Sequence, residues 1–359
     1  MGLRDEIAEM TKLPERNLDL LRAVAVLCVV TLHFLISQQA TGYGWVGRAG
    51  VLLFFVHTSL VLMGSIERTW TEPNWVRSFY MRRAFRIYPL AIVVAVGMIL
   101  AQVPPFVPVP GKPIAYVAPS TYGILANLAL VQNIAGQAPV LDVLWTLPLE
   151  LQMYVVLPVC FLIAVGGPRR IVVLLAASVI PATVFLLFAD RIPGLWRLTV
   201  LEFVPCFLSG VLAYSILRTH SARLRSMWWI PALALALGIY AVAEVPAGEW
   251  AMCLFVGLAI TAVRELPESW LTRSAFVVAK YSYGIYLTHV PALRITLALL
   301  PHASRLIVIL VFVAITAALS WLGFHLIERP AIDAGKRLIR RRLGRPALAD
   351  MSGEAISEA

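Results

Sequence analysis

The sequence predicts an all-α polytopic integral membrane protein with about ten transmembrane helices. Of its 359 residues, 60% are hydrophobic and only 14% are charged, and its mean hydropathy is +0.82. An ordinary soluble domain carries about 25% charged residues, so this composition excludes that class. The apolar residues gather in runs close to the length that crosses a bilayer, roughly 17–25 residues each.

Ten such runs follow one another along the chain, separated by polar or charged segments. Several are short or contain proline, which a membrane helix tolerates when its neighbours satisfy the backbone. The first run lacks a small-residue cleavage site, so we interpret it as a retained span and not as a signal peptide. The expected spans are Leu18–Ser37, Val51–Ile66, Ile87–Val103, Leu144–Val165, Ile171–Ala189, Leu198–Leu217, Trp228–Ala243, Ala247–Val263, Tyr281–Leu300 and Leu306–Ile327.

The spans define one membrane domain, residues 18–330, between a short N-terminal segment, residues 1–17, and a basic tail, residues 331–359. We expect the tail to form a surface helix that ends in a disordered stub. A long Pro-rich connection joins the third and fourth spans, and its Tyr122–Ile134 stretch predicts a short helix at the membrane interface. No internal repeat and no soluble domain is evident.

The basic residues indicate the orientation of the chain. With the N-terminus in the cytoplasm, 23 of the 30 Lys and Arg residues fall in inner segments and five in outer loops. This asymmetry fits the positive-inside rule with both termini cytoplasmic, as in a multi-pass plasma-membrane protein. The net charge of +10 therefore reflects topology, and a nucleic-acid partner is not expected.

Arg22 and His33 both lie within the first span. Eleven residues make about three helical turns, so both side chains lie on one face, about 16 Å apart along the axis. Ionisable residues inside a membrane span mark functional sites by default. An imidazole there could accept a proton from a hydroxyl group near neutral pH. Internal hydrogen bonding to a neighbouring helix is the alternative role of His33.

A cluster of arginines precedes the third span. Arg83 and Arg86 are spaced i, i+3 and point the same way on a helix, and Arg82 adds a third cation. Guanidinium groups bind phosphate in bidentate fashion, so this fork suits a phosphate or pyrophosphate group. The alternative is a basic loop that sets topology and touches anionic lipid.

The fourth span carries a carboxylate, Glu150, just after Pro148 and one turn before Tyr154. Such a group could orient an imidazole, act as an acid or base, or pair with a buried arginine. Glu202 is a weaker candidate of the same kind.

Two further histidines lie within spans, His57 and His289, each beside small or hydroxyl-bearing residues that allow close helix packing. Packing is the favoured role of His57, whereas packing and chemistry are equally open for His289. His325 and Glu328 are expected to form a cluster at the end of the last span.

The sequence lacks a nucleotide-binding glycine loop, a zinc-ligand pattern and a Gly-x-Ser-x-Gly elbow. No pair of the four cysteines has the spacing of metal ligands, and all four lie in apolar runs. We therefore expect buried thiols, no metal, and no ATP-driven transport by this chain alone.

In this order the segments resemble the acyltransferase 3 family of membrane-bound, acyl-CoA-dependent O-acyltransferases. The resemblance covers residues 17–332 and rests on the ordered set of motifs, since no single motif is specific. The matching segments are Leu20-LRAVAVLCVVTLH-His33, Gly50-VLLFFV-Val56, Tyr80-MRRAFRIYP-Pro89, Trp145-TLPLELQMY-Tyr154, Tyr283-GIYLTH-His289 and Ile327-ERP-Pro330. The family's Ser-Gly-Phe after the Phe-Phe pair is here Thr58-Ser59-Leu60, and its Asp after Gly-Val is Leu52.

The resemblance implies transfer of an acyl group, with acetyl expected, from cytoplasmic acyl-CoA to a hydroxyl of a carbohydrate, as in polysaccharide modification, or of a small-molecule acceptor. It implies a bacterial-type inner membrane. It carries the family's Arg-x10-His pair onto Arg22 and His33, its Arg-x-x-Arg pair onto Arg83 and Arg86, and its acidic position onto Glu150. The arginines would hold the phosphates of coenzyme A.

In this scheme His33 deprotonates the acceptor or carries the acyl group briefly, and Glu150 orients His33. His57, Tyr154 and His289 are the expected substrate contacts. One alternative is a proton-coupled transporter that uses His33, Glu150 and His289 as a relay. Another is a non-catalytic scaffold in a polysaccharide assembly complex. Acceptor identity, the side on which it is modified and the oligomeric state stay open.

Overall fold

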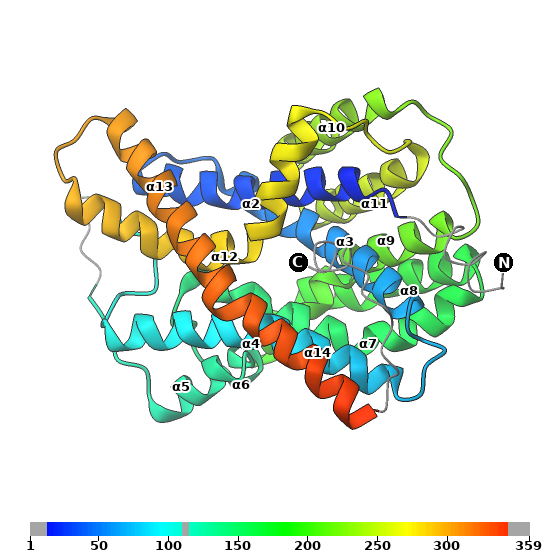
Figure 1. The fold of residues 1–359 in the computed structure, drawn as a ribbon, viewed down its shortest axis with the longest axis horizontal. Helices are drawn as coiled ribbons and strands as arrows, with labels where there is room; N and C mark the ends of the chain where they lie inside the picture. Colours follow the sequence, from blue (N-terminus) through cyan, green and yellow to red (C-terminus); the bar gives the residue numbers. More distant parts are fainter. Residues whose placement is uncertain (1–12, 110–114, 344–359) are drawn as a thin grey trace.

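The protein is an all-helical polytopic membrane protein (Figure 1). The computed structural model describes residues 13–109 and 115–343. Within these ranges there is no β-strand, only one isolated bridge between Leu224 and Val263. The ends of the predicted N-terminal segment and basic tail lie outside the described residues.

Ten long helices build the bundle, counted over the described residues. They are α2 (Glu15–Ser37), α3 (Gly44–Glu67), α4 (Trp75–Leu100), α7 (Thr146–Val165), α8 (Pro168–Phe188), α9 (Val200–Leu217), α10 (Trp229–Val242), α11 (Pro246–Ala262), α12 (Trp270–Leu299) and α13 (Arg305–Gly323). Each predicted span falls on one of them.

Shorter elements connect or extend these helices. They are α5 (Thr121–Leu128), α6 (Gln132–Ala135), the single turns η1 (Asp142–Trp145), η2 (Leu195–Leu198), η3 (Ser226–Trp228) and η4 (Phe324–Glu328), and α14 (Arg329–Leu343). Helices α5 and α6 occupy the stretch for which a short helix was predicted, and Ser120 caps α5 by accepting a hydrogen bond from the Gly123 backbone amide.

Seven of the described helices are long and apolar enough to cross a membrane, and two more, Ser226–Val242 and Pro246–Ala262, are apolar but shorter. Helix α12 is the longest single helix at 30 residues, yet it does not belong to these nine. It carries Arg273, Lys280, His289 and Arg294, which lower its hydropathy. The polytopic class is confirmed, while a count of ten spans stays a prediction.

Helix α3 lies at the centre of the bundle, packed against α2 on one side and α9 on the other. Two glycines allow this close approach. A Cβ on Gly50 would lie 2.5 Å from the Ala25 carbonyl oxygen, and one on Gly210 would lie 2.2 Å from the Val56 carbonyl oxygen. Small residues at such contacts let membrane helices approach closely. Helix α12 packs on α2 and α13, so α2 is packed against both α3 and α12.

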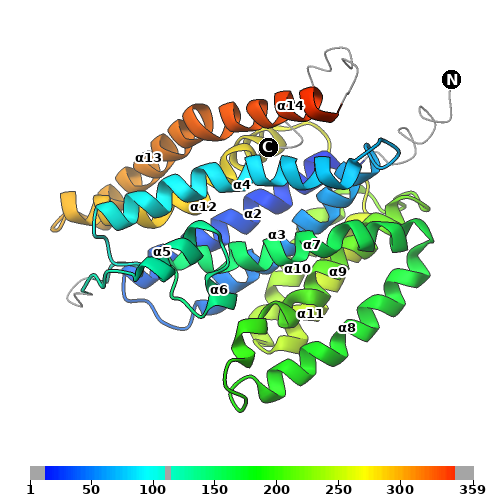
Figure 2. The same cartoon turned by 90° about the horizontal axis from the view of Figure 1, so that it is seen from below.

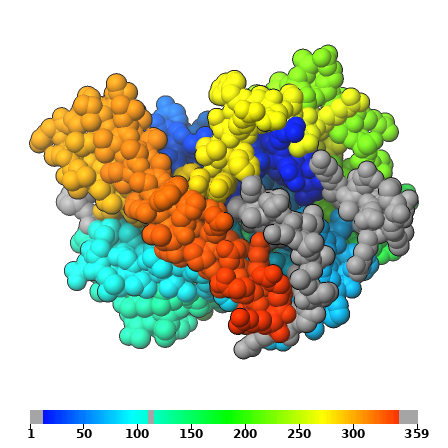
Figure 3. Space-filling view, in the orientation of Figure 1, coloured from blue at the N-terminus to red at the C-terminus, as the bar shows by residue number. Residues whose placement is uncertain are grey.

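Helices α13 and α14 form one continuous helix that crosses the face of the molecule (Figures 1 and 3). A π-helical turn, Phe324–Glu328, joins them. The expected helix end at His325 and Glu328 is therefore wrong, because the chain continues from α13 through this turn into α14. Figure 2 shows α13 and α14 along one edge of the bundle and α8 along the opposite edge.

Asn17 fixes the start of α2. Its amide nitrogen donates to the Arg264 carbonyl oxygen at 3.2 Å, and its Oδ1 accepts from the Leu266 amide at 2.9 Å. The indole of Trp229 donates to the Asn17 carbonyl oxygen at 3.2 Å. The side chain is fully buried. This anchoring sets the position of α2, and with it Arg22, relative to α12.

Candidate functional site

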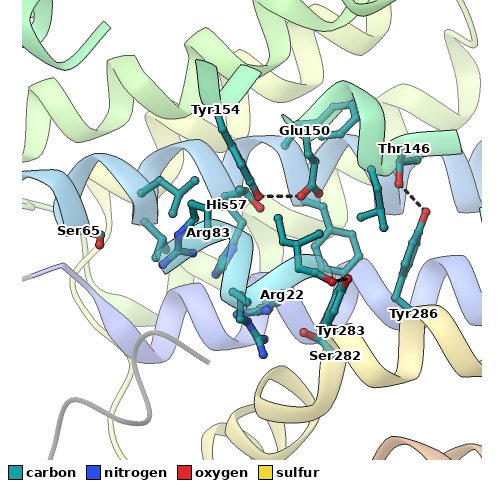
Figure 4. A pocket seen from close by; sticks show the side chains of 18 of the residues that line it. Arg22, His57, Ser65, Arg83, Thr146, Glu150, Tyr154, Ser282, Tyr283 and Tyr286 are labelled. Atoms are coloured by element: carbon teal, nitrogen blue, oxygen red, sulfur yellow. Dashed lines mark hydrogen bonds between the residues drawn. The ribbon is translucent and has the colours of Figure 1, made fainter. Parts of the chain in front are cut away.

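A cavity opens between α2, α3, α4, α7 and α12 (Figure 4). We call it the arginine cavity. Its empty space, which includes a part open to solvent, is about 930 Å³. Its lining residues are Arg22, Val51, Phe54, Phe55, His57, Thr58, Val61, Leu62, Ser65, Arg68, Arg83, Arg86, Ile87, Thr146, Leu147, Glu150, Tyr154, Ser282, Tyr283 and Tyr286.

The cavity carries an excess of positive charge. Four arginines line it, Arg22, Arg68, Arg83 and Arg86, against one carboxylate among the lining residues, Glu150. Ser65 lies at one end of the cavity and Tyr286 and Thr146 at the other, with Arg83 and Arg22 between them (Figure 4). A basic cavity of this kind attracts anions, above all phosphates, which guanidinium groups bind in bidentate fashion.

The carboxylate of Glu150 belongs to the cavity wall. It accepts a hydrogen bond from the Tyr154 hydroxyl at 2.8 Å, one helical turn along α7. Arg22 and Arg83 are close enough to act on its charge. Tyr283 donates to the Ile87 carbonyl oxygen at 2.6 Å across from α12 to α4. Tyrosine hydroxyls thus brace the cavity wall between helices.

Arg86 is held from outside the cavity. It forms an ion pair with Glu328 on the π-helical turn, and its guanidinium lies 5.4 Å from the centre of the Tyr283 ring. Both members of the pair are buried, with Glu328 only 1% exposed. A π-turn inserts one residue into a helix and turns a side chain to a new face, a device frequent at functional sites. Here it directs Glu328 toward Arg86.

Tyr286 closes the end of the cavity away from the arginines (Figure 4). Its hydroxyl donates to the Val143 carbonyl oxygen at 2.7 Å and lies 2.7 Å from the Thr146 hydroxyl, which then serves as the donor. The ring of Phe54 meets Tyr286 edge to face, with centroids 6.1 Å apart. These contacts join α12 to the start of α7.

His33 lies beyond this end and pairs with His289. The Nε2 of His289 is 3.0 Å from the Nδ1 of His33, and the ring centroids are 4.9 Å apart. Both rings are buried, at 8% and 0% exposed. The His289 ring also lies 6.2 Å from the Tyr286 ring. The pair therefore adjoins the Tyr286 end of the arginine cavity.

The backbone contacts assign the protons of the two neutral rings. His33 Nδ1 lies 2.9 Å from the Val29 carbonyl oxygen, and His289 Nδ1 lies 3.0 Å from that of Ile285. A carbonyl only accepts, so each Nδ1 carries the hydrogen. His289 Nε2 is then an acceptor toward His33 Nδ1–H. This leaves Nε2 of His33 with its lone pair, as a general base requires.

The structure brings six of the predicted site residues into one cavity: Arg22, Arg83, Arg86, His57, Glu150 and Tyr154. Two others, His33 and His289, form the separate pair. Arg82 is not among the lining residues, and its Nη2 donates to the Thr69 hydroxyl at 3.1 Å. Glu150 was expected to orient His33, but the ring partner of His33 is His289, because α12 and not α7 packs against α2 at this level.

Sequence reasoning missed several residues of the site. Arg68 was counted only as a topology charge, and Glu328 only as a helix-end residue. Arg68 is the fourth cation of the arginine cavity, and Glu328 is the carboxylate that pairs with Arg86. Tyr286 and His289 are spaced i, i+3, and Ser282 lies one turn before Tyr286. That polar stripe on α12 was the available signal. Within the described residues, no group of three or more His, Cys, Asp or Glu could hold a metal ion.

Comparison with protein families decides the class of the chain. The profile of the acyltransferase 3 family, described as an acyltransferase domain, matches residues 15–325, most of the sequence. This protein belongs to the acyltransferase 3 family. It is therefore a membrane acyltransferase, and the match includes every residue of the cavity and the histidine pair.

Two curated proteins are similar over most of the chain. Nodulation protein 10 of Rhizobium leguminosarum bv. viciae is 26% identical over 364 residues, which cover 91% of this chain and 96% of that protein. Peptidoglycan O-acetyltransferase OatA of Listeria monocytogenes is 25% identical over 353 residues, or 88% of this chain. The alignment covers 55% of OatA, so this chain spans about half of that relative. No solved structure matches the chain.

Proposed function

We propose that this acyltransferase moves an acyl group, with acetyl expected, from acyl-CoA to a hydroxyl group of a carbohydrate acceptor. One observation carries the proposal: a cavity with four arginines lies on one side of Tyr286, and a histidine pair with an available base lies on the other. Helix α2 takes part in both, since it carries Arg22 of the cavity and His33 of the pair.

The donor fits the arginine cavity by charge and by shape. Coenzyme A carries a diphosphate and a 3′-phosphate, which Arg22, Arg68 and Arg83 would bind. Its long neutral arm would follow the apolar and hydroxyl-bearing part of the cavity toward Tyr286. The positive-inside count supports a cytoplasmic position for this entrance, on the side where acyl-CoA is made. The thioester would then arrive next to the histidine pair.

The histidine pair supplies the base. In the proposed step Nε2 of His33 takes the proton of the acceptor hydroxyl while the acceptor oxygen bonds to the carbonyl carbon. The carbon–sulfur bond then breaks, and the thiolate leaves with that proton as the thiol. His289 would support the imidazolium of His33 by accepting its Nδ1–H at Nε2. Tyr286 lies between the cavity and the histidine pair. Its side chain must therefore move for the thioester to reach the acceptor hydroxyl.

The names of the relatives support the choice of acceptor. OatA is a peptidoglycan O-acetyltransferase, and peptidoglycan is a carbohydrate polymer. Both relatives are bacterial proteins, which supports a place in a bacterial inner membrane. The predicted topology puts His33 in the outer half of its span, nearer an acceptor outside the cell.

The test is acetyl-CoA binding and thioester turnover by the purified protein in detergent, for wild type, His33→Ala and Arg83→Ala. We expect His33→Ala to bind acetyl-CoA as wild type does and to lose about 10²–10⁴-fold in turnover, the usual contribution of a general base. Arg83→Ala should weaken binding about 10-fold or more, through loss of charged hydrogen bonds. Full turnover by folded His33→Ala, or no binding of coenzyme A by wild type, would overturn the proposal.

A further inference from the structure

We propose that Ser282 is a donor-binding residue that donates a hydrogen bond to an amide carbonyl of the pantetheine arm of coenzyme A. This inference rests on the proposed function and identifies a contact by which the site recognises the acyl-CoA donor. Phosphates alone would not distinguish coenzyme A from other anionic metabolites. A hydroxyl placed along the arm would.

The Ser282 hydroxyl is a buried polar group without a partner. The residue is 1% exposed and lines the arginine cavity, beside Arg22 and Tyr283 (Figure 4). Its Oγ has no hydrogen-bond partner among the described residues. A buried donor without a hydrogen bond lowers the free energy of unfolding by about 1–3 kcal/mol, so native proteins contain few such groups. A bound ligand with an acceptor atom at this position would supply the missing hydrogen bond.

Four other hydroxyls of the cavity wall already donate. Tyr154 donates to Glu150, Tyr283 to the Ile87 carbonyl oxygen and Tyr286 to the Val143 carbonyl oxygen. The Thr146 hydroxyl donates to that of Tyr286. Ser282 thus differs from them in having its hydrogen available for a ligand. An acceptor atom on a ligand would satisfy this hydrogen.

The position of Ser282 along α12 matches the pantetheine arm. Ser282 lies seven residues before His289, which is about 10 Å along the helix axis. An extended chain advances about 3.5 Å per three bonds. If the thioester carbon lies at the level of the histidine pair, the two amide carbonyls of the arm fall five and nine bonds away, about 6 and 11 Å. Ser282 is therefore level with the amide segment and too far from the histidines to touch the reacting carbonyl.

The test compares two ligands that share phosphates and differ in the arm. Acetyl-CoA carries the arm, and adenosine 3′,5′-bisphosphate is the phosphate-bearing fragment without it. Ser282→Ala should weaken acetyl-CoA about 3- to 10-fold, the worth of one neutral hydrogen bond, and leave the fragment within twofold. It should raise KM for acetyl-CoA with little change in kcat. Arg83→Ala should weaken both ligands.

Ser59→Ala is the matched control. Ser59 is equally buried, but its hydroxyl donates to the Phe55 carbonyl oxygen at 2.9 Å within its own helix and does not line the cavity. It should change neither ligand. Ser282→Ala binding acetyl-CoA as tightly as wild type, or losing both ligands alike, would overturn the inference while leaving donor binding intact. Failure of wild type to bind either ligand would instead remove the proposed function.

Discussion

Two arginine-containing clusters lie toward opposite ends of α3, and they use arginine in different ways. Near the start of α3, Arg48 binds Glu249 through two hydrogen bonds, Nε to Oε1 at 2.8 Å and Nη2 to Oε2 at 3.1 Å, and also pairs with Glu202. Tyr240 donates to the same Glu249 at 3.1 Å. At the other end, the arginine cavity sets four arginines against one lining carboxylate.

The ratio of the charges separates a structural cluster from a binding site. In the Arg48 cluster two carboxylates surround one guanidinium, which leaves it little capacity for a ligand, and the cluster ties the ends of α3, α9 and α11 together. In the arginine cavity the excess of cations can be balanced by an anion from outside. Residue types alone do not make this distinction, since both clusters combine arginine, glutamate and tyrosine.

Arg48→Ala should produce the largest change. It would leave two glutamates, 12% and 7% exposed, facing each other without their cation. Loss of one partner of a buried pair costs about 3–5 kcal/mol; because Arg48 is itself 29% exposed, we expect about 2–4 kcal/mol. Thermal unfolding in detergent measures the loss. Unchanged stability would show that the Arg48 cluster is not structural. Arg218→Ala is the control: it breaks a single ion pair, with Glu67, and should lower stability by less.

Glu328→Gln tests the same comparison at the arginine cavity. It removes the carboxylate that pairs with Arg86 and so raises the net charge near the arginine cavity by one. We expect coenzyme A to bind several-fold more tightly at low salt, with a steeper dependence on ionic strength. Stability should fall too, but by less than for Arg48→Ala, because the amide oxygen of glutamine can still accept a hydrogen bond from Arg86. Weaker binding that does not respond to salt would show that Glu328 acts only by holding Arg86 in place.

The smallest effects come from a matched tyrosine pair. Tyr240→Phe and Tyr154→Phe each remove one hydroxyl that donates to a glutamate, Glu249 in the Arg48 cluster and Glu150 in the cavity. Tyr240→Phe should cost about 0.5–1.5 kcal/mol of stability and leave turnover unchanged. Tyr154→Phe should lower turnover of acetyl-CoA instead. Equal effects of both variants on turnover would erase the difference between the clusters.

Much of the fold could be predicted from hydropathy and charge. A membrane helix must satisfy its backbone hydrogen bonds internally, and it appears in the sequence as an apolar run long enough to cross the bilayer. Six site residues were predictable for a related reason: Arg22, Arg83, Arg86, His57, Glu150 and Tyr154 stand out in or beside apolar runs, where a polar group is costly.

The partners of these residues were not predictable from spacing. His33 and His289 are 256 positions apart, and Arg86 and Glu328 are 242 apart. Which helices adjoin is decided by packing, such as the close contacts at Gly50 and Gly210, and a single sequence does not display it. Spacing also assumed regular α-helix through His325 and Glu328, whereas the chain forms a π-turn there.

That five-residue turn, Phe324–Glu328, makes the charge balance of the site depend on chain length as well as on composition. Deleting one residue from it would restore ordinary helical spacing and rotate the chain that follows by about 100° relative to α13. Ile339, now 2% exposed, would turn away from its contacts although no residue near it had changed. Among related proteins, the insertion or loss of a single codon at this turn would therefore change the pairing of Arg86, which lies on a helix far away in the sequence.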